Sequence, residues 1–264
     1  NRPARERRRD IAEAMETKSE EEARADVARR LDEERRKKGP NRSSGSSGVG
    51  PMAYEIGTKL DLWEGRARLN LSAFHYDYDD YQSFSLTNFV QSIVNRDATV
   101  NGGEVEFAWH PARGLDLNVG VSVLDSEVED VPTTGLIGAT LTPTPVTAVD
   151  AELPNAPKFS ANGVVRYEWP AWAGSLSAQV DFRYNSSQSL EATNAPGTNE
   201  DAYFLGNLDV TYRSAQDSWR VSAWLKNFSD TEYRIYALDT SFVGNIQSVY
   251  GPPRTLGISA AYHW

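Results

Sequence analysis

The chain has 264 residues, a formal net charge of −10 at neutral pH, 39% hydrophobic residues and no cysteine. The absence of cysteine excludes disulfide bonds, thiolate catalysis and zinc–sulfur sites, and the acidic balance argues against a nucleic-acid partner. No run of apolar residues approaches the roughly 18 that a membrane-spanning helix needs, which excludes a helical membrane protein. A membrane β-barrel stays possible, because its alternating strands have a modest mean hydropathy.

The first 52 residues differ in composition from the rest of the chain. Residues 1–40 are densely charged with few apolar positions, so we expect a charged helical or disordered segment without a core of its own. Its basic runs would suit a nucleic-acid or membrane surface, but the interspersed carboxylates favour a solvated face. Residues 41–52 have the composition of a flexible linker. Since the chain starts at Asn1, we expect that its native N-terminus is missing.

From residue 53 to residue 264 the sequence alternates between polar and apolar residues, which is the period of a β-strand. In 176–184, for example, Leu, Ala, Val, Phe and Tyr alternate with Ser, Gln, Asp and Arg. The nine predicted strands lie near residues 54–62, 66–78, 103–110, 115–123, 161–169, 176–184, 204–213, 219–226 and 254–264. The sequence therefore predicts an all-β fold in this part.

The connections between these strands alternate in length. Tight turns are predicted at 64–65, 112–114, 170–174 and 215–217, and longer connections near 83–99, 126–156, 186–201 and 230–252. A soluble sandwich would also alternate along its strands. Short turns at one end and long loops at the other are, however, typical of antiparallel transmembrane barrels, whose strands face lipid on one side and a wet lumen on the other. We therefore expect about nine strands of such a barrel, a number that leaves open edges.

The last predicted strand ends at the final residue with a row of apolar side chains at every second position. The row consists of Leu256, Ile258, Ala260, Tyr262 and Trp264. It resembles the C-terminal signal by which bacterial outer-membrane barrels are handed to their assembly machinery.

Several segments, taken in order, resemble the C-terminal part of a TonB-dependent outer-membrane receptor barrel. They are YEIGTK at 54–59, GEVE at 103–106 followed by WHP at 109–111, LPNAPKF at 153–159, a W-x-x-N-x-x-D-x-x-Y pattern at 224–233 and GPPRTLG at 251–257. The resemblance covers roughly residues 53–264.

The resemblance implies an outer-membrane receptor that takes up a scarce nutrient, such as a ferric siderophore or another metal chelate, with energy delivered through TonB. The plug domain that would contact TonB has no counterpart in residues 1–50, so we expect a fragment of a larger barrel surrounded by outer-membrane lipid. A passive, porin-like or structural barrel is the alternative, and a soluble β-domain is a weaker one.

No pattern of catalytic residues stands out, so we expect no enzyme activity and no cofactor. The three histidines, His75, His110 and His263, lie on different predicted strands without metal-ligand spacing, so no metal site is expected. From the expected direction of side chains, we predict ligand contacts at Arg166, Arg183 and Tyr184. The long connections, such as 126–156, would determine which ligand binds, and the sequence does not identify it.

Overall fold

The structure is a computed structural model of the chain, and it describes residues 52–87, 90–133, 136–137, 142–143, 147–195, 197–240 and 244–263. All of these belong to the unit Gly50–Trp264. The predicted charged segment 1–40, the linker apart from Met52, and Trp264 of the predicted assembly signal lie outside the described residues.

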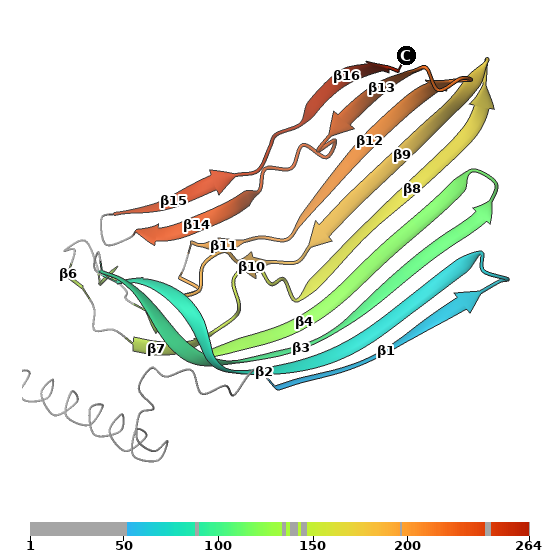
Figure 1. Ribbon diagram of the computed structural model, residues 1–264. Coiled ribbons are helices and arrows are strands. Elements are labelled where there is room, and N and C mark those ends of the chain that lie inside the picture. Colours follow the sequence, from blue (N-terminus) through green and yellow to red (C-terminus); the bar gives the residue numbers. More distant parts are fainter. Residues whose placement is uncertain are drawn as a thin grey trace, which may run out of the picture. The chain divides into compact units, whose positions relative to one another are not determined.

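Nine strands form one antiparallel sheet, in which each strand pairs with the strands that precede and follow it in this order (Figure 1). They are β1 (Met52–Leu62), β2 (Ala67–Thr87), β3 (Val90–Ala112), β4 (Leu115–Thr133), β8 (Phe159–Ala171), β9 (Gly174–Asn185), β12 (Tyr203–Ser214), β13 (Trp219–Lys226) and β16 (Thr255–Tyr262). A tenth strand, β7 (Thr147–Ala151), pairs with the end of β4. The all-β prediction and its nine strands are confirmed.

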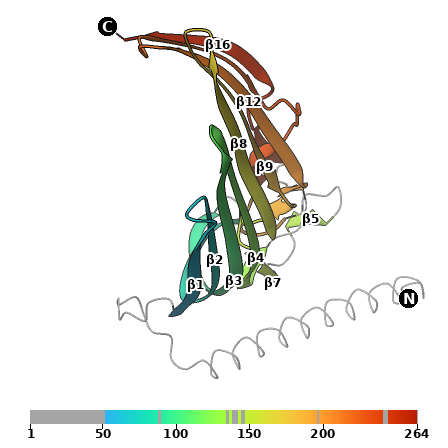
Figure 2. The same ribbon diagram turned by 90° about the vertical axis from the view of Figure 1, so that its right-hand side faces the viewer.

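The sheet curves and twists from β1 to β16 (Figure 2). Among the described strands, β1 pairs only with β2 and β16 pairs only with β13, so both edges of the sheet are open. None of the described residues belongs to a helix long and apolar enough to cross a membrane.

Paired residues on neighbouring strands share a face of the sheet. Because the pairing aligns apolar with apolar positions, the alternation of polar and apolar residues along each strand gives the sheet one apolar and one polar face. One continuous row is apolar on all nine strands: Leu62, Ala67, Trp109, Leu117, Val165, Val180, Leu208, Leu225 and Leu256. We call its side the apolar face. The opposite side, the polar face, includes Lys59, Asn70, Glu106, Asn162 and Arg183.

Large side chains on the apolar face are poorly covered by protein. Val180 in the middle of the sheet is 38% exposed, and Ile258 at the β16 edge is 78% exposed. A soluble sandwich would bury such a face against a second sheet. Here the described part of the chain supplies no second layer (Figure 2).

The two ends of the sheet differ as predicted. At one end, β1–β2, β3–β4, β8–β9 and β12–β13 are joined by turns of two to four residues at 63–66, 113–114, 172–173 and 215–218. Positive backbone φ angles at Trp63, Glu64, Trp172 and Asp217, and at Gly65 and Gly114, close these turns. We call this the short-turn end, and the other the loop end.

The long connections contain more strand structure than predicted. They hold β5 (Leu136–Ile137), β6 (Thr142–Pro143), β10 (Gln188–Ser189), β11 (Asn199–Glu200), β14 (Arg234–Thr240) and β15 (Asn245–Tyr250). Part of the segment expected as a loop at 83–99 continues the β2–β3 hairpin, with pairs from Tyr81–Arg96 to Thr87–Val90. A register shift next to Asp80, whose φ is 62°, allows the hairpin to continue beyond the regular sheet.

Two of the motifs on which the family resemblance rests pack against each other. The ring of Trp224 covers Gly257, where any Cβ atom would clash with it, and the ring of Tyr233 covers Gly251 in the same way. Asp230 forms an ion pair with Arg254 at 3.0 Å. The motif at 224–233 therefore fixes the position of the segment 251–257 that leads into the last strand.

Asn227, the remaining residue of that motif, is 6% exposed and has a φ of 49°. Its Nδ2 donates to the carbonyl oxygens of Thr231 at 2.9 Å and Pro252 at 3.3 Å, and its Oδ1 accepts the Thr231 N–H at 3.1 Å. A short polar side chain that tolerates a positive φ and bonds locally is what this turn requires.

Candidate functional site

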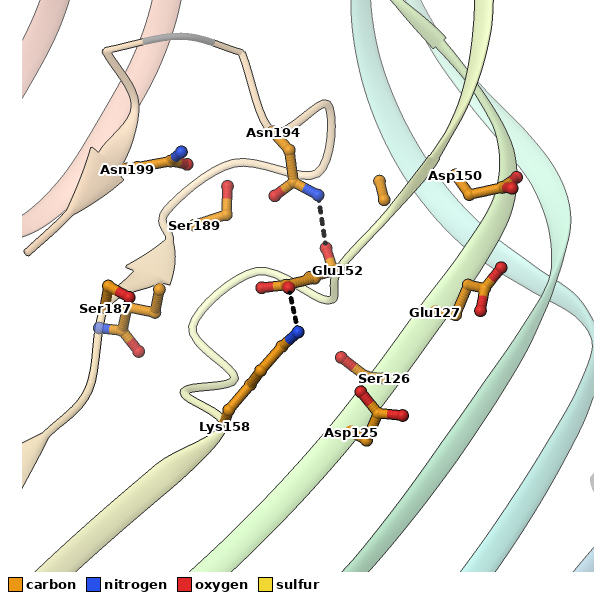
Figure 3. Close-up of a pocket in the computed structure, with 12 residues that line it drawn as sticks. Asp125, Ser126, Glu127, Asp150, Glu152, Lys158, Ser187, Ser189, Asn194 and Asn199 are labelled. Carbon is orange, nitrogen blue, oxygen red and sulfur yellow. Dashed lines mark hydrogen bonds and ion pairs between the residues drawn. The ribbon is translucent and has the colours of Figure 1, made fainter.

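A hollow of about 550 Å³ opens at the loop end, next to the point where β4 leaves β8 (Figure 3). β4 pairs with β8 as far as Val123–Phe159, and it pairs with β7 only from Val128–Ala151 onward. Residues 124–127, between these pairs, stay paired with β3 on one side of β4 but have no strand partner on the side of β7 and β8. We call this the loop-end hollow. It is lined by Asp125, Ser126, Glu127, Asp150, Ala151, Glu152, Lys158, Ser187, Gln188, Ser189, Asn194 and Asn199.

Three segments that are distant in the sequence build the hollow, and backbone groups tie them together. The Leu153 N–H donates to Ser126 Oγ at 3.1 Å, which joins the segment after β7 to β4. The Asn155 N–H donates to the Ser189 carbonyl at 2.8 Å, and Asn194 Nδ2 donates to the Glu152 carbonyl at 3.3 Å. The connection after β9 is thereby held against the segment 152–158.

A small apolar cluster supports the end of β4. Ala98, Val128, Val131 and Ala151 are each at most 4% exposed, and Tyr78, Tyr81 and Leu153 pack against them. Because this cluster joins β2, β3, β4 and β7, it fixes the strand ends from which Asp125, Glu127 and Asp150 project.

The hollow is acidic. Four carboxylates and one ammonium group line it, and Lys158 Nζ pairs with Glu152 Oε1 at 2.8 Å. The hydrogen bond to Glu152 and its charge raise the pKa of Lys158 above its ordinary value, so this ammonium group keeps its proton. Asp150 Oδ1 accepts the backbone N–H of Asp130 at 3.2 Å.

A second set of contacts ties the connection after β9 to the β14–β15 hairpin. Arg234 Nε pairs with Glu200 Oε2 at 2.7 Å, and Nη1 donates to the Gly197 carbonyl at 2.7 Å. The Asp239 N–H donates to Glu191 Oε2 at 3.0 Å. Sequence reasoning did not single out Arg234 or Glu191, because their partners lie more than 30 residues away in the chain.

The three predicted ligand contacts do not face one common site, and none lines the loop-end hollow. Arg166 is on the polar face near the short-turn end, where it pairs with Glu168 and lies 3.7 Å from Asp116 Oδ2. Arg183 is on the polar face near the loop end of β9. Tyr184 is on the apolar face, because neighbouring residues of a strand point to opposite faces. Its ring centroid lies 5.9 Å from that of Phe159. Their role in ligand binding stays a prediction.

Near Arg183 the polar face carries two stacked tyrosines. The rings of Tyr203 and Tyr233 lie 5.1 Å apart, and Asn185 Nδ2 donates to the Tyr203 hydroxyl at 2.9 Å. The predicted site therefore gains aromatic neighbours at the loop end, and the sequence alone gave no sign that residues 203 and 233 meet.

The rings of His75 and His110 each lie within hydrogen-bond distance of one polar side chain. His75 Nδ1 is 2.7 Å from Asn101 Oδ1, and His110 Nδ1 is 2.6 Å from Asp116 Oδ1. Within the described ranges, no group of three or more histidine or carboxylate side chains is arranged to hold a metal ion.

Comparison with known proteins identifies relatives of this fold. The model of the TonB-dependent receptor-like β-barrel family matches residues 52–228. The ferric yersiniabactin uptake receptor FyuA from Yersinia pestis has a similar structure, with a TM-score of 0.61 and 18% identity over 80% of this chain and 29% of that chain.

Two further receptors are similar. The siderophore receptor PiuA from Acinetobacter baumannii has a TM-score of 0.60 and 17% identity over 80% of this chain and 28% of that chain. The ferric-catecholate import receptor Fiu from E. coli K12 has a TM-score of 0.59 and 19% identity over 86% of this chain and 31% of that chain. The chain thus spans less than a third of the length of these three structures.

Proposed function

Because this chain belongs to the family of TonB-dependent receptor-like β-barrels, which are outer-membrane proteins, we propose that it is part of a receptor for TonB-dependent uptake of a scarce nutrient, namely a ferric siderophore. The similar structures named above are an uptake receptor for ferric yersiniabactin, a siderophore receptor and an import receptor for ferric catecholates, which supports this substrate class.

The observation that carries the proposal is the division of one sheet into two chemically different faces. A row of apolar side chains crosses all nine strands, and Val165, Val180 and Leu256 in this row are exposed, as side chains in contact with lipid would be. The polar face would line the lumen, through which a hydrophilic nutrient passes. The loop end, with its polar hollow, would face the outside and bind the nutrient first (Figure 3).

The partners follow from this arrangement. Outer-membrane lipid would surround the apolar face, and the assembly machinery would bind the exposed edge strand β16, where Leu256, Ile258, Ala260 and Tyr262 all project from one face. TonB would act through a plug region, for which residues 1–50 show no sequence resemblance. A passive, porin-like barrel is the alternative, and no observation on the described residues favours it over the receptor.

Uptake of radioactive iron from ferric siderophores tests the proposal. Cells in which the gene encoding this chain is disrupted should lose uptake of at least one ferric siderophore, and deletion of tonB should abolish the same uptake. Restoration of the gene should restore uptake only in cells that have TonB. Equal uptake with and without TonB, accompanied by swelling of liposomes that contain the purified protein, would instead establish a passive barrel.

A further inference from the structure

We propose that lipid covers β2, β3 and β4 only up to one row of paired residues, and that beyond this row the same side of the sheet lies in water. The row, which we call the boundary row, consists of Ile56, Ala73, Gly103, Val123 and Phe159. The inference rests on the membrane position of the proposed receptor and deepens it, because it places the outer limit of the lipid-contact surface at named residues.

The first argument is a change in the chemistry of β4 along its lipid-facing side. Every second residue from Leu115 to Val123 is a leucine or a valine. The next three residues on the same side are Asp125, Glu127 and Glu129, and all three are exposed. The apolar face of β4 therefore ends at Val123.

The neighbouring strands change at the same level. On β2, Leu69 and Leu71 are followed on the same side by His75 and Asp77. The register joins the polar positions into two rows, one of His75, Asn101 and Asp125 and one of Asp77, Thr99 and Glu127. Charged side chains on the lipid side of a barrel are costly inside the hydrocarbon and nearly neutral at its limits. These rows therefore lie at or beyond the edge of the acyl chains.

The opposite side of the sheet changes in the reverse sense. Below the boundary row it carries polar residues such as Asn118 and Glu106. Beyond the row, Val100 is 7% exposed and Val128 is 2% exposed, and the rings of Phe74 and Tyr76 stack with centroids 5.2 Å apart. The two faces have exchanged their character, as expected of an antiparallel sheet with a core on one side and water on the other.

The lengths of the strands agree with this limit. β2, β3 and β4 have 21, 23 and 19 residues, which is about twice the roughly 9–11 that a tilted strand needs to cross a bilayer. The part of β4 that pairs with β8, Leu115–Val123, has nine residues and is long enough by itself. Because the turns at the other end are short, the excess lies at the loop end, past the level at which β8 begins (Figure 1).

Aromatic side chains mark the same level on the other strands. Phe159 is the first residue of β8, and Tyr184 and Phe204 form a pair on β9 and β12 that is aligned with Ala161, two residues from Phe159. Phe159 and Phe204 are each 39% exposed. Aromatic girdles flank the apolar band of membrane barrels at both interfaces, so this observation supports the limit independently of the charges.

Single cysteines that carry a spin label test the inference, because the chain has no cysteine of its own. The full 264-residue chain is placed in phospholipid vesicles, and collisions of each label with oxygen and with a water-soluble nickel chelate are measured by electron paramagnetic resonance. Val105→Cys and Val119→Cys lie on the lipid side before the boundary row, and Thr99→Cys and Glu127→Cys lie on the same side beyond it.

Oxygen concentrates in hydrocarbon, whereas the nickel chelate stays in water. We expect the ratio of oxygen to nickel collisions to be at least about threefold lower at residues 99 and 127 than at residues 105 and 119, since moving a polar solute into hydrocarbon costs free energy. Thr99→Cys removes no charge, so its result does not depend on the loss of a carboxylate. Residues 99 and 127 test the same limit on different strands, and either one decides if the other variant does not fold.

Asn118→Cys is the matched control, because residue 118 is next to Val119 on the opposite side of the sheet. Its label should meet the nickel chelate if the polar face is wet. Ratios at residues 99 and 127 as high as those at 105 and 119 would overturn the inference and leave the receptor function to the uptake experiment. Equally low ratios at residues 105, 118 and 119 would overturn it together with the membrane position on which the proposed function depends.

Discussion

At the scale of single residues, Glu191 shows how the fold changes the chemistry of an ordinary side chain. Burial raises the pKa of this carboxyl group, the N–H of Asp239 that it accepts at 3.0 Å lowers it, and the negative charge of Asp239 raises it again. The net effect is a raised pKa, so the folded state holds the proton to a higher pH than the unfolded chain does.

The raised pKa of Glu191 predicts how the connection after β9 depends on pH. Between the ordinary pKa of 4.5 and the raised pKa, the folded state binds more protons than the unfolded state, so the stability of the folded arrangement that buries Glu191 falls as the pH rises through that interval. Hydrogen exchange of the Asp239 amide, corrected for the intrinsic rate, should therefore show stronger protection at pH 5 than at pH 8, as long as exchange requires an opening that exposes Glu191 to water.

The variant Glu191→Gln should remove this pH dependence, because the amide is neutral at both pH values and can still accept the N–H of Asp239. Glu232→Gln, at an exposed glutamate in the connection before β14, is the matched control and should behave like the unchanged protein. A pH dependence that survives in Glu191→Gln would assign the titration to another group.

At the scale of elements, the packing of 224–233 against 251–257 explains why these residue types recur at this spacing. Trp224 and Tyr233 each place a ring over a glycine, Asp230 pairs with Arg254, and Asn227 bonds to the Pro252 carbonyl. A ring over a strand glycine replaces the missing side chain and fixes the register of the pair. The last strand therefore enters the sheet in a defined position.

The variant Gly257→Ala tests this packing. The added methyl group would overlap the Trp224 ring, which must move, so we expect a loss of about 1–3 kcal/mol in the free energy of unfolding. Urea unfolding in phospholipid vesicles measures this loss.

The second variant in this test removes the ring. If the clash is the cause, Gly257→Ala should cost much less in a protein that already carries Trp224→Ala, because the methyl group then fills free space. Equal costs in the two backgrounds would show that the conformational freedom of glycine, and not the ring, determines the residue at this position.

At the scale of the whole sheet, the separation of its two faces is what makes a membrane position favourable. The apolar row crosses every strand, while the polar face carries charged residues such as Lys59, Glu106 and Arg183. The short-turn and loop ends then lie at opposite surfaces of the bilayer, and the long connections all lie at one of them.

Two neighbouring residues of β9 test this assignment. Val180→Arg places a charge on the apolar face near the middle of the strand and should cost about 2–4 kcal/mol in unfolding free energy in lipid vesicles. Gln179→Arg places the same charge on the polar face and should cost about 1 kcal/mol or less, since water reaches that side. Similar costs at both positions would contradict a lipid-facing side.

The sequence by itself determined the strands, their faces and the short turns. The alternation of polar and apolar residues in 176–184 indicates directly which side chains share a face of the sheet. Glycines such as Gly65 and Gly114 indicate turns that need a positive φ angle. These signals are local in the chain, so reading along it was sufficient.

Only the tertiary structure decided where the loop-end hollow forms and which residues line it. Asp125, Asp150 and Asn194 come from three different segments, and nothing in the sequence near any one of them indicates the other two. The same applies to the extended β2–β3 hairpin and to Arg234, whose partners are supplied by another connection. The charge and shape of the hollow are properties of the space between segments, and that space is defined only once the strands have taken their register.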